Sequence, residues 1–176
     1  MNKKYRAIRK WVFYGLAYTV LAVLQTTVVP NIVLLGVHPN LLPMAAAMVA
    51  VLEGGVPGAM FGLFAGIICD ALYPTFEIIH MLFLFVSGYF IGRLVAALFR
   101  RNFVVCALSA LISLTVLDFL LALLFFLIPG RAGSSVLYEV VLPEIALSAL
   151  ATPPVYGLLR LVHRKLGSGE EEEPVI

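Results

Sequence analysis

The sequence predicts an all-α integral membrane protein with six transmembrane helices in one bundle, and composition, length and segmentation carry this prediction. Of the 176 residues, 62% are hydrophobic and only 12% are charged. A soluble domain usually has about 25% charged residues, and its core cannot bury so much apolar surface. Because a span needs roughly 20 apolar residues, a chain of this length holds at most about seven spans. Proline, glycine and charged residues divide the apolar sequence into six runs.

The six predicted spans follow the breaks between these runs. Proline closes the first, Glu53 and two glycines separate the second from the third, and Arg100–Arg101 closes the fourth. The predicted spans are 11–29, 39–52, 56–72, 78–99, 103–128 and 138–162. We treat residues 1–166 as one transmembrane domain and residues 167–176, which include four consecutive glutamates, as a disordered acidic cytoplasmic tail.

The second and third spans are short. At 1.5 Å per residue they reach roughly 21 to 26 Å, less than the roughly 30 Å hydrocarbon core. Either flanking residues extend them, or they form a buried helical hairpin shielded by longer neighbours. We favour the hairpin because the connecting turn is tight and rich in glycine.

The distribution of basic residues predicts that both termini are cytoplasmic. Cytoplasmic loops collect Lys and Arg. With an even number of spans, the inner side holds five cations among the first ten residues together with Arg93, Arg100, Arg101, Arg160, Arg164 and Lys165. The outer side then holds only Arg131. Removing one span would move the last basic cluster outside and abolish this asymmetry.

Small residues recur at four-residue intervals in the third span and predict a close-packing face. The series comprises Gly54, Gly58, Gly62 and Gly66, and Gly88 and Gly92 give the fourth span a weaker version. Such faces let helix backbones approach closely in lipid. We favour packing within the bundle over the alternative, a docking face for a partner helix; a homodimer is also compatible with these faces.

Ionisable residues within the spans gather in the predicted outer half. Charges in hydrocarbon are costly, so each is a functional candidate. The outer polar cluster comprises Asp70, Glu77, His80, Asp118, Glu139 and Glu144. We favour a structural role, in which these groups lie near head groups, cap helices or hydrogen-bond to nearby hydroxyls. The alternatives are a polar pocket that opens outward and a contact for a partner helix; a proton relay is disfavoured because Glu53 is the only acid at the inner face.

The sixth span is predicted to be kinked and packed inward. Pro143 and the pair Pro153–Pro154 remove backbone donors and bend a helix. Glu144, Ser148, Thr152 and Tyr156 recur at four-residue spacing and form a polar face that can supply or meet partners for the freed carbonyls. We favour a plain kink over a binding role for this helix.

The sequence contains no pattern typical of an enzyme or a cofactor site. It has no P-loop, no dinucleotide-binding glycine motif, no nucleophile elbow and no metal-ligand spacing. We therefore expect no catalytic residue, no metal and no cofactor. Cys69 and Cys106 fall near opposite membrane faces, which argues against a disulfide between them.

Several local motifs occur in a specific order over most of the chain. They are PNLL at 39–42, GGVPGA at 54–59, FGLFAG at 61–66, DAL at 70–72, GYFIGR at 88–93, RR at 100–101 and PVYGLLR at 154–160. In order, spacing and total length the chain resembles the MreD family of the bacterial rod-shape system. Asn40 departs from the family pattern, where an acid is frequent, and so do Glu77 and His80 in the usually uncharged segment before the fourth span.

The resemblance implies a non-catalytic scaffold in the bacterial cytoplasmic (inner) membrane. Its expected partner is MreC, a single-span protein with an extracytoplasmic domain, whose transmembrane segment would dock on the bundle. Through MreC, such proteins work with the MreB filament and with RodA and penicillin-binding-protein synthases, and so regulate lateral peptidoglycan synthesis.

An alternative belongs to another functional class. MreD-like bundles are similar to the substrate-binding subunits of energy-coupling-factor vitamin transporters, which also have about six helices and an outward pocket. An acidic outer pocket suits a cationic or hydroxyl-rich ligand. Against this reading, the first span has no small-residue coupling face, because Ala17 is followed four residues later by Leu21. A transporter of lipid-linked precursors has only the polar outer half in its favour.

Overall fold

The computed structural model describes residues 3–31, 37–73, 78–127 and 141–167. Its elements are all helices, as the sequence predicts. They are α1 (Lys3–Thr27), the 3-10 turn η1 (Val29–Asn31), α2 (Leu41–Glu53), α3 (Gly55–Leu72), α4 (Ile79–Leu98), α5 (Phe103–Leu127) and α6 (Leu142–Gly167). Of the predicted acidic tail, residues 168–176 lie outside the described residues.

The short helix α2 forms the centre of the bundle. Every residue from Leu41 to Leu52 is buried, and α2 contacts each of α1, α3, α4, α5 and α6. Leu41–Leu52 is apolar on all sides of the helix, and a helix of this kind is stable only where other helices surround it. The predicted shielding of the second span is therefore seen, whereas α3 exposes Val56, Met60 and Phe64 on its outer face.

Five of the six α-helices, all except α2, are long and apolar enough to cross a membrane. With 13 residues, α2 extends only about 20 Å along its axis. The structure thus provides five candidate spans and one shorter central helix, and the count of six complete spans stays a prediction.

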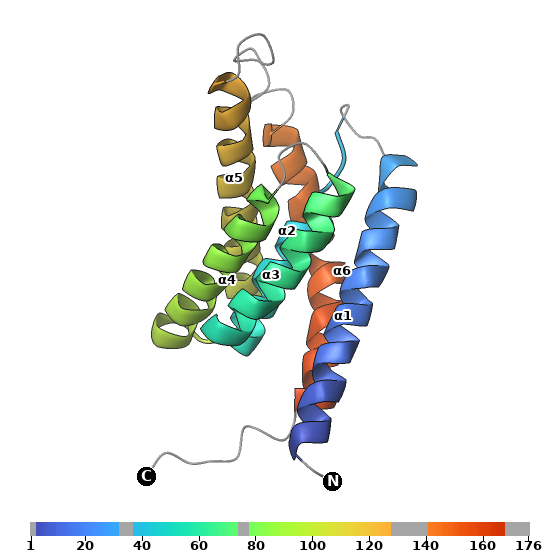
Figure 1. The fold of residues 1–176 in the computed structure, drawn as a ribbon, viewed down its shortest axis with the longest axis vertical. Helices are drawn as coiled ribbons and strands as arrows, with labels where there is room; N and C mark the ends of the chain where they lie inside the picture. The colour runs from blue at the N-terminus through green and yellow to red at the C-terminus, as the bar shows by residue number, and fades with distance from the viewer. Residues whose placement is uncertain (1–2, 32–36, 74–77, 128–140, 168–176) are drawn as a thin grey trace.

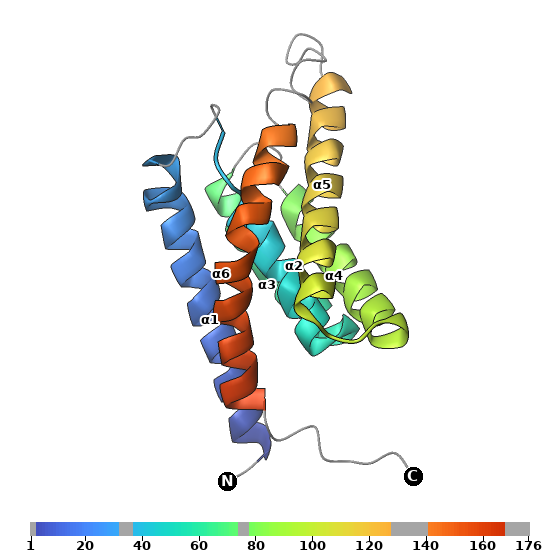
Figure 2. The same cartoon turned by 180° about the vertical axis from the view of Figure 1, so that it is seen from behind.

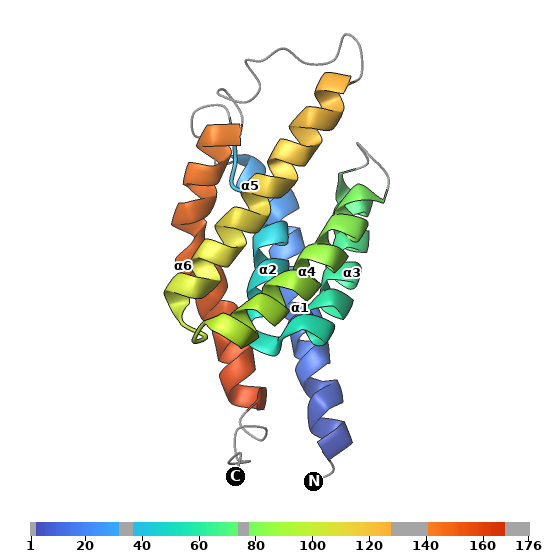
Figure 3. The same cartoon turned by 90° about the vertical axis from the view of Figure 1, so that its left-hand side faces the viewer.

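The outer helices are arranged around α2 in a fixed order. α3 and α4 run side by side and form the most extensive helix pair (Figure 3). From behind, α6 lies between α1 and α5 (Figure 2) and contacts both. α1 begins and α6 ends at the same end of the bundle (Figure 1), which we call the terminal end. The opposite end, where α5 ends and α6 begins, is the distal end.

Large apolar side chains cover the outside of the bundle. Examples from five helices are Val12, Met60, Phe90, Ile112 and Leu150, each at least 60% exposed. Soluble monomers rarely leave so large a continuous apolar surface in water. These faces suit contact with lipid, and they identify a multi-pass membrane protein.

The turn between α2 and α3 depends on one glycine and one arginine. Gly54 has a φ of 97°, a conformation that costs little only for glycine. The Arg101 Nη1 donates a hydrogen bond of 2.9 Å to the carbonyl oxygen of Leu52. This bond satisfies one of the carbonyls that the end of α2 leaves without an intrahelical partner.

One proline does not behave as predicted. Pro143 is the second residue of α6, within the first turn, where a helix loses no internal hydrogen bond to proline; it therefore marks a helix start and no kink. Pro153 and Pro154 do lie inside the helix. The predicted inward face of α6 is confirmed for Ser148 and Thr152, which are buried.

Candidate functional site

The glycines of α3 lie against the glycines and backbone of α4. A Cβ atom added to Gly58 would lie 2.7 Å from the Ala50 Cα and 3.0 Å from the Gly88 carbonyl oxygen. A Cβ on Gly62 would overlap the backbone of Leu84, and one on Gly92 would overlap Gly54. Gly66 is equally close to the first turn of α4. These small-residue faces are occupied by one another and are not available to a second protein.

Asp70, near the end of α3, contacts the first turn of α4. Its Oδ1 accepts hydrogen bonds from the His80 backbone N–H at 3.1 Å and lies 2.8 Å from the His80 Nδ1. Its Oδ2 accepts a bond of 3.0 Å from the Met81 N–H. The first N–H groups of a helix have no internal partners and attract negative charge. Asp70 thus caps α4 from a neighbouring helix.

Asp118 and Glu144 meet at a polar cavity near the distal end. The cavity has a volume of about 210 Å³ and is lined by His38, Asn40, Tyr73, His80, Asp118, Leu121, Phe125 and Glu144. These residues come from five segments of the chain: the residues before α2, the end of α3, and α4, α5 and α6. The structure therefore brings together residues that are more than a hundred positions apart in sequence.

Hydrogen bonds hold the segment that carries Asn40. The Gln25 side chain donates to the Pro39 carbonyl oxygen at 3.0 Å and accepts from the Leu41 N–H at 2.9 Å. The Asn40 N–H donates to the Ser148 Oγ at 3.0 Å. α1 and α6 thus fix the chain just before α2, and this fixes the position of the Asn40 side chain at the cavity.

Of the predicted outer polar cluster, Asp70, His80, Asp118 and Glu144 lie together at the distal end. Glu77 and Glu139 lie outside the described residues, as does Arg131. The cluster is therefore divided into a capping pair, Asp70 with His80, and a cavity-lining pair, Asp118 with Glu144. His38 and Tyr73 also line the cavity, and the sequence analysis assigned neither to it.

A second polar cluster lies at the terminal end. Lys10 Nζ and Glu53 Oε2 are 2.5 Å apart, and their side chains are 9% and 6% exposed. The Tyr14 hydroxyl donates to Glu53 Oε1 at 2.7 Å, and His163 Nδ1 lies 2.9 Å from the same oxygen. The sequence singled out only Glu53 as an acid on this side, and Lys10 was one of the five cations predicted for the same side. Tyr14 and His163 were not predicted to join them.

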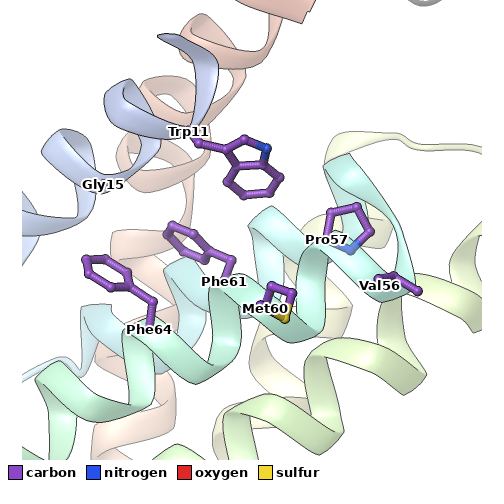
Figure 4. A pocket seen from close by; sticks show the side chains of 7 residues that line it. All are labelled: Trp11, Gly15, Val56, Pro57, Met60, Phe61 and Phe64. Carbon is purple, nitrogen blue, oxygen red and sulfur yellow. The ribbon is translucent and has the colours of Figure 1, made fainter. Parts of the chain in front are cut away.

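An apolar groove runs between α1 and α3 toward the terminal end. It has a volume of about 470 Å³ and is lined by Trp11, Gly15, Val56, Pro57, Met60, Phe61 and Phe64. In Figure 4 the Trp11 indole projects from α1 into the space above Phe61 and Met60. Trp11 and Phe61 are in contact, with ring centroids 6.2 Å apart. A Cβ atom on Gly15 would meet nothing within 4 Å, so the groove is open there.

Comparison with known proteins decides the family. The family model described as rod shape-determining protein MreD matches residues 5–162. The chain belongs to the MreD family. This match spans α1 to α6 and includes the glycine faces, the cavity and the groove. No curated protein and no solved structure matches the chain.

Membership of the MreD family gives the chain a role in rod-shape determination. MreD proteins are membrane components of the MreBCD shape-determining system, which agrees with the apolar outer surface of this bundle. Among the described residues no group of three His, Cys, Asp or Glu is placed to hold a metal ion. The candidate functional features of this MreD-family chain are the apolar groove between α1 and α3 and the polar cavity at the distal end.

Proposed function

We propose that this chain is a non-catalytic scaffold of the bacterial elongation complex. It lies in the inner membrane as one six-helix domain of residues 1–166, with both termini and the tail of residues 167–176 in the cytoplasm. It docks the transmembrane helix of an MreC-like single-span protein, and through it helps to regulate lateral peptidoglycan synthesis by RodA and penicillin-binding-protein synthases along the MreB filament.

The groove between α1 and α3 is the observation that carries this proposal. A transmembrane helix needs an apolar surface that its side chains can enter, and small residues let it approach closely. Gly15 provides the small residue, while the exposed side chains of Val56 and Met60 provide the apolar wall. The glycine faces of α3 and α4 do not serve this purpose because they already pack against each other.

The aromatic residues behind the groove support docking without rearrangement. Phe61 contacts Tyr14 and Tyr18 with ring centroids 6.1 and 5.5 Å apart. The Tyr18 hydroxyl also donates to the Ala65 carbonyl oxygen at 3.3 Å. These contacts join α1 to α3 along the floor of the groove, so a partner helix meets a preformed surface and loses little affinity to ordering it.

A matched pair of glycine substitutions tests the proposal. Gly15 and Gly157 both have open space around an added Cβ, but only Gly15 lines the α1–α3 groove. We expect Gly15→Leu to fill the groove and reduce recovery of the MreC-like partner in a detergent pull-down by at least about tenfold, the effect of about 1.4 kcal/mol. Gly157→Leu should recover the partner as the wild type does.

Cell shape gives a second readout. Cells whose only copy of this protein carries Gly15→Leu should lose rod shape, whereas cells whose only copy carries Gly157→Leu should keep it.

The pull-down also separates the proposal from its alternative. Equal recovery of the partner by both variants would remove docking from this groove. Recovery of ATPase subunits in place of the MreC-like protein would favour the substrate-binding subunit of a vitamin-type transporter.

A further inference from the structure

The cavity at the distal end contains hydrogen-bond acceptors that no described protein group satisfies. Asp118 Oδ2 and Asn40 Oδ1 are both buried and have no hydrogen-bond partner among the residues that the structure describes. Asp118 is only 7% exposed, and both residues line the same cavity. Buried polar atoms are normally paired, because an unsatisfied acceptor costs about 1–3 kcal/mol. Two such acceptors beside one cavity indicate a ligand that donates hydrogen bonds.

The remaining polar groups define the charge of that ligand. Glu144 lines the same cavity as Asn40 and Asp118, and it is close enough to act electrostatically on Asp118. The His80 ring is already directed at Asp70. No Lys or Arg is among the described residues that line the cavity. His38 is the other basic side chain in the lining, and it lies at the exposed edge. Two carboxyl groups with no Lys or Arg beside them favour a positive ligand.

The size and the lining of the cavity indicate which kind of positive ligand fits. Its volume of about 210 Å³ admits a small organic group, and Leu121 and Phe125 give one wall an apolar surface. A metal ion is not favoured, since no described group of three His, Cys, Asp or Glu is placed to hold one. A primary ammonium supplies three N–H donors and one positive charge on a compact head, and a short carbon chain suits the apolar wall.

We propose that this cavity binds a primary ammonium group, held by Asp118, Asn40 and Glu144. The ammonium comes from a free amine or from the head group of an aminophospholipid, and both sources present the same donors to the same acceptors. His38 is exposed and forms part of the lining, so the cavity is open on that side. The site is independent of the docking of MreC on the groove between α1 and α3.

Ethanolamine and choline provide a matched pair of probes for the full-length chain in detergent. Both are monovalent cations with the same hydroxyethyl arm, but the nitrogen of choline carries three methyl groups and no N–H donors. With the probe at about ten times its Kd, we expect ethanolamine to raise the Tm of the wild type by roughly 3 °C. Choline should leave the Tm unchanged. Stabilisation by both probes to the same extent, or by magnesium ions alone, would overturn the proposal.

A second pair of samples tests the lipid source. In nanodiscs that contain phosphatidylethanolamine, the wild type should have a higher Tm than in nanodiscs of phosphatidylcholine with the same acyl chains. A response to the lipid but not to ethanolamine assigns the ammonium to the head group, and a response to ethanolamine alone assigns it to a free amine. A response to neither contradicts the site.

Variants place the effect at the cavity. Asp118→Asn keeps the size of the side chain but replaces one acceptor by a donor, so it should abolish the response to the ammonium. Glu144→Gln, on another helix, should weaken the response to the ammonium. It keeps the test available if Asp118→Asn does not fold. Ser113→Ala is the control, because Ser113 lies on α5 and also lacks a partner but does not line the cavity. An undiminished response in both carboxyl variants would refute the assignment.

Discussion

Asp70 is a capping residue that one helix supplies to the next. α4 begins after Ile78, which has a φ of 79° and makes no side-chain cap of its own. The carboxylate of Asp70 accepts the N–H groups of His80 and Met81 in its place. The sequence placed Asp70 and His80 at the same membrane face, but it did not reveal that the charge serves the start of α4.

Removal of this cap should destabilise the protein. In Asp70→Ala, two N–H groups at the start of α4 lose their acceptor, and we expect the free energy of unfolding to fall by about 1–3 kcal/mol. Chemical denaturation in one detergent measures the change. Ser113→Ala serves as the comparison, since the Ser113 hydroxyl has no partner to lose. A loss for Ser113→Ala as large as for Asp70→Ala would show that the cap contributes nothing specific.

The second polar cluster, at the terminal end, shows where residue-level prediction from sequence ends. Three side chains, those of Lys10, Tyr14 and His163, meet at Glu53, although Lys10 and His163 are 153 positions apart in sequence. Sequence periodicity assigns a face to each helix, but it does not give the rotation of α1 and α6 about their own axes. A buried ion pair adds little net stability, yet it fixes which faces meet. This cluster therefore defines the register of α1, α2 and α6.

Glycine spacing is the strongest element-level signal in the chain. The four-residue repeat predicted a close-packing face on α3, and the structure pairs that face with Gly88 and Gly92 on α4. The repeat did not identify the neighbour, because spacing describes one helix and a contact requires two. The apolar run of α2 likewise predicted a helix, whereas its central place follows from the packing of five longer helices around it.

The difference between a packed and an open glycine is testable on two helices. Gly62→Ala places a Cβ against the backbone of Leu84, which cannot move aside without shifting α4, so we expect a loss of about 1–3 kcal/mol in stability. Gly15→Ala meets open space and should leave stability unchanged or slightly higher. For a chain of this size the loss corresponds to a fall in Tm of roughly 2–12 °C. Equal melting temperatures would contradict the close α3–α4 contact.

Considered as a whole, the molecule has two chemically different ends. At the terminal end, α1 begins and α6 ends (Figure 1). Arg101 donates a hydrogen bond to the Leu52 carbonyl oxygen at the end of α2. Acidic and neutral polar groups surround the cavity at the distal end. Composition predicted a membrane protein, and the positions of the apolar runs and charged residues along the chain predicted a bundle with different ends. An outward polar pocket was only one alternative that the sequence left open, and the groove between α1 and α3 was not predicted, since both arise between helices that are distant in sequence.

The position of the C-terminus tests whether α2 counts as a span. α2 reaches only about 20 Å, but α1 and α6 are packed together with the start of one beside the end of the other. This arrangement requires an even number of crossings. We expect a fluorescent protein fused to the C-terminus to fluoresce in the cytoplasm, and alkaline phosphatase at the same position to be inactive. Fusions after Leu127, which lack α6, should give the reverse result. Active phosphatase on the full-length chain would mean an odd number of crossings, and would then exclude the proposed six-span topology.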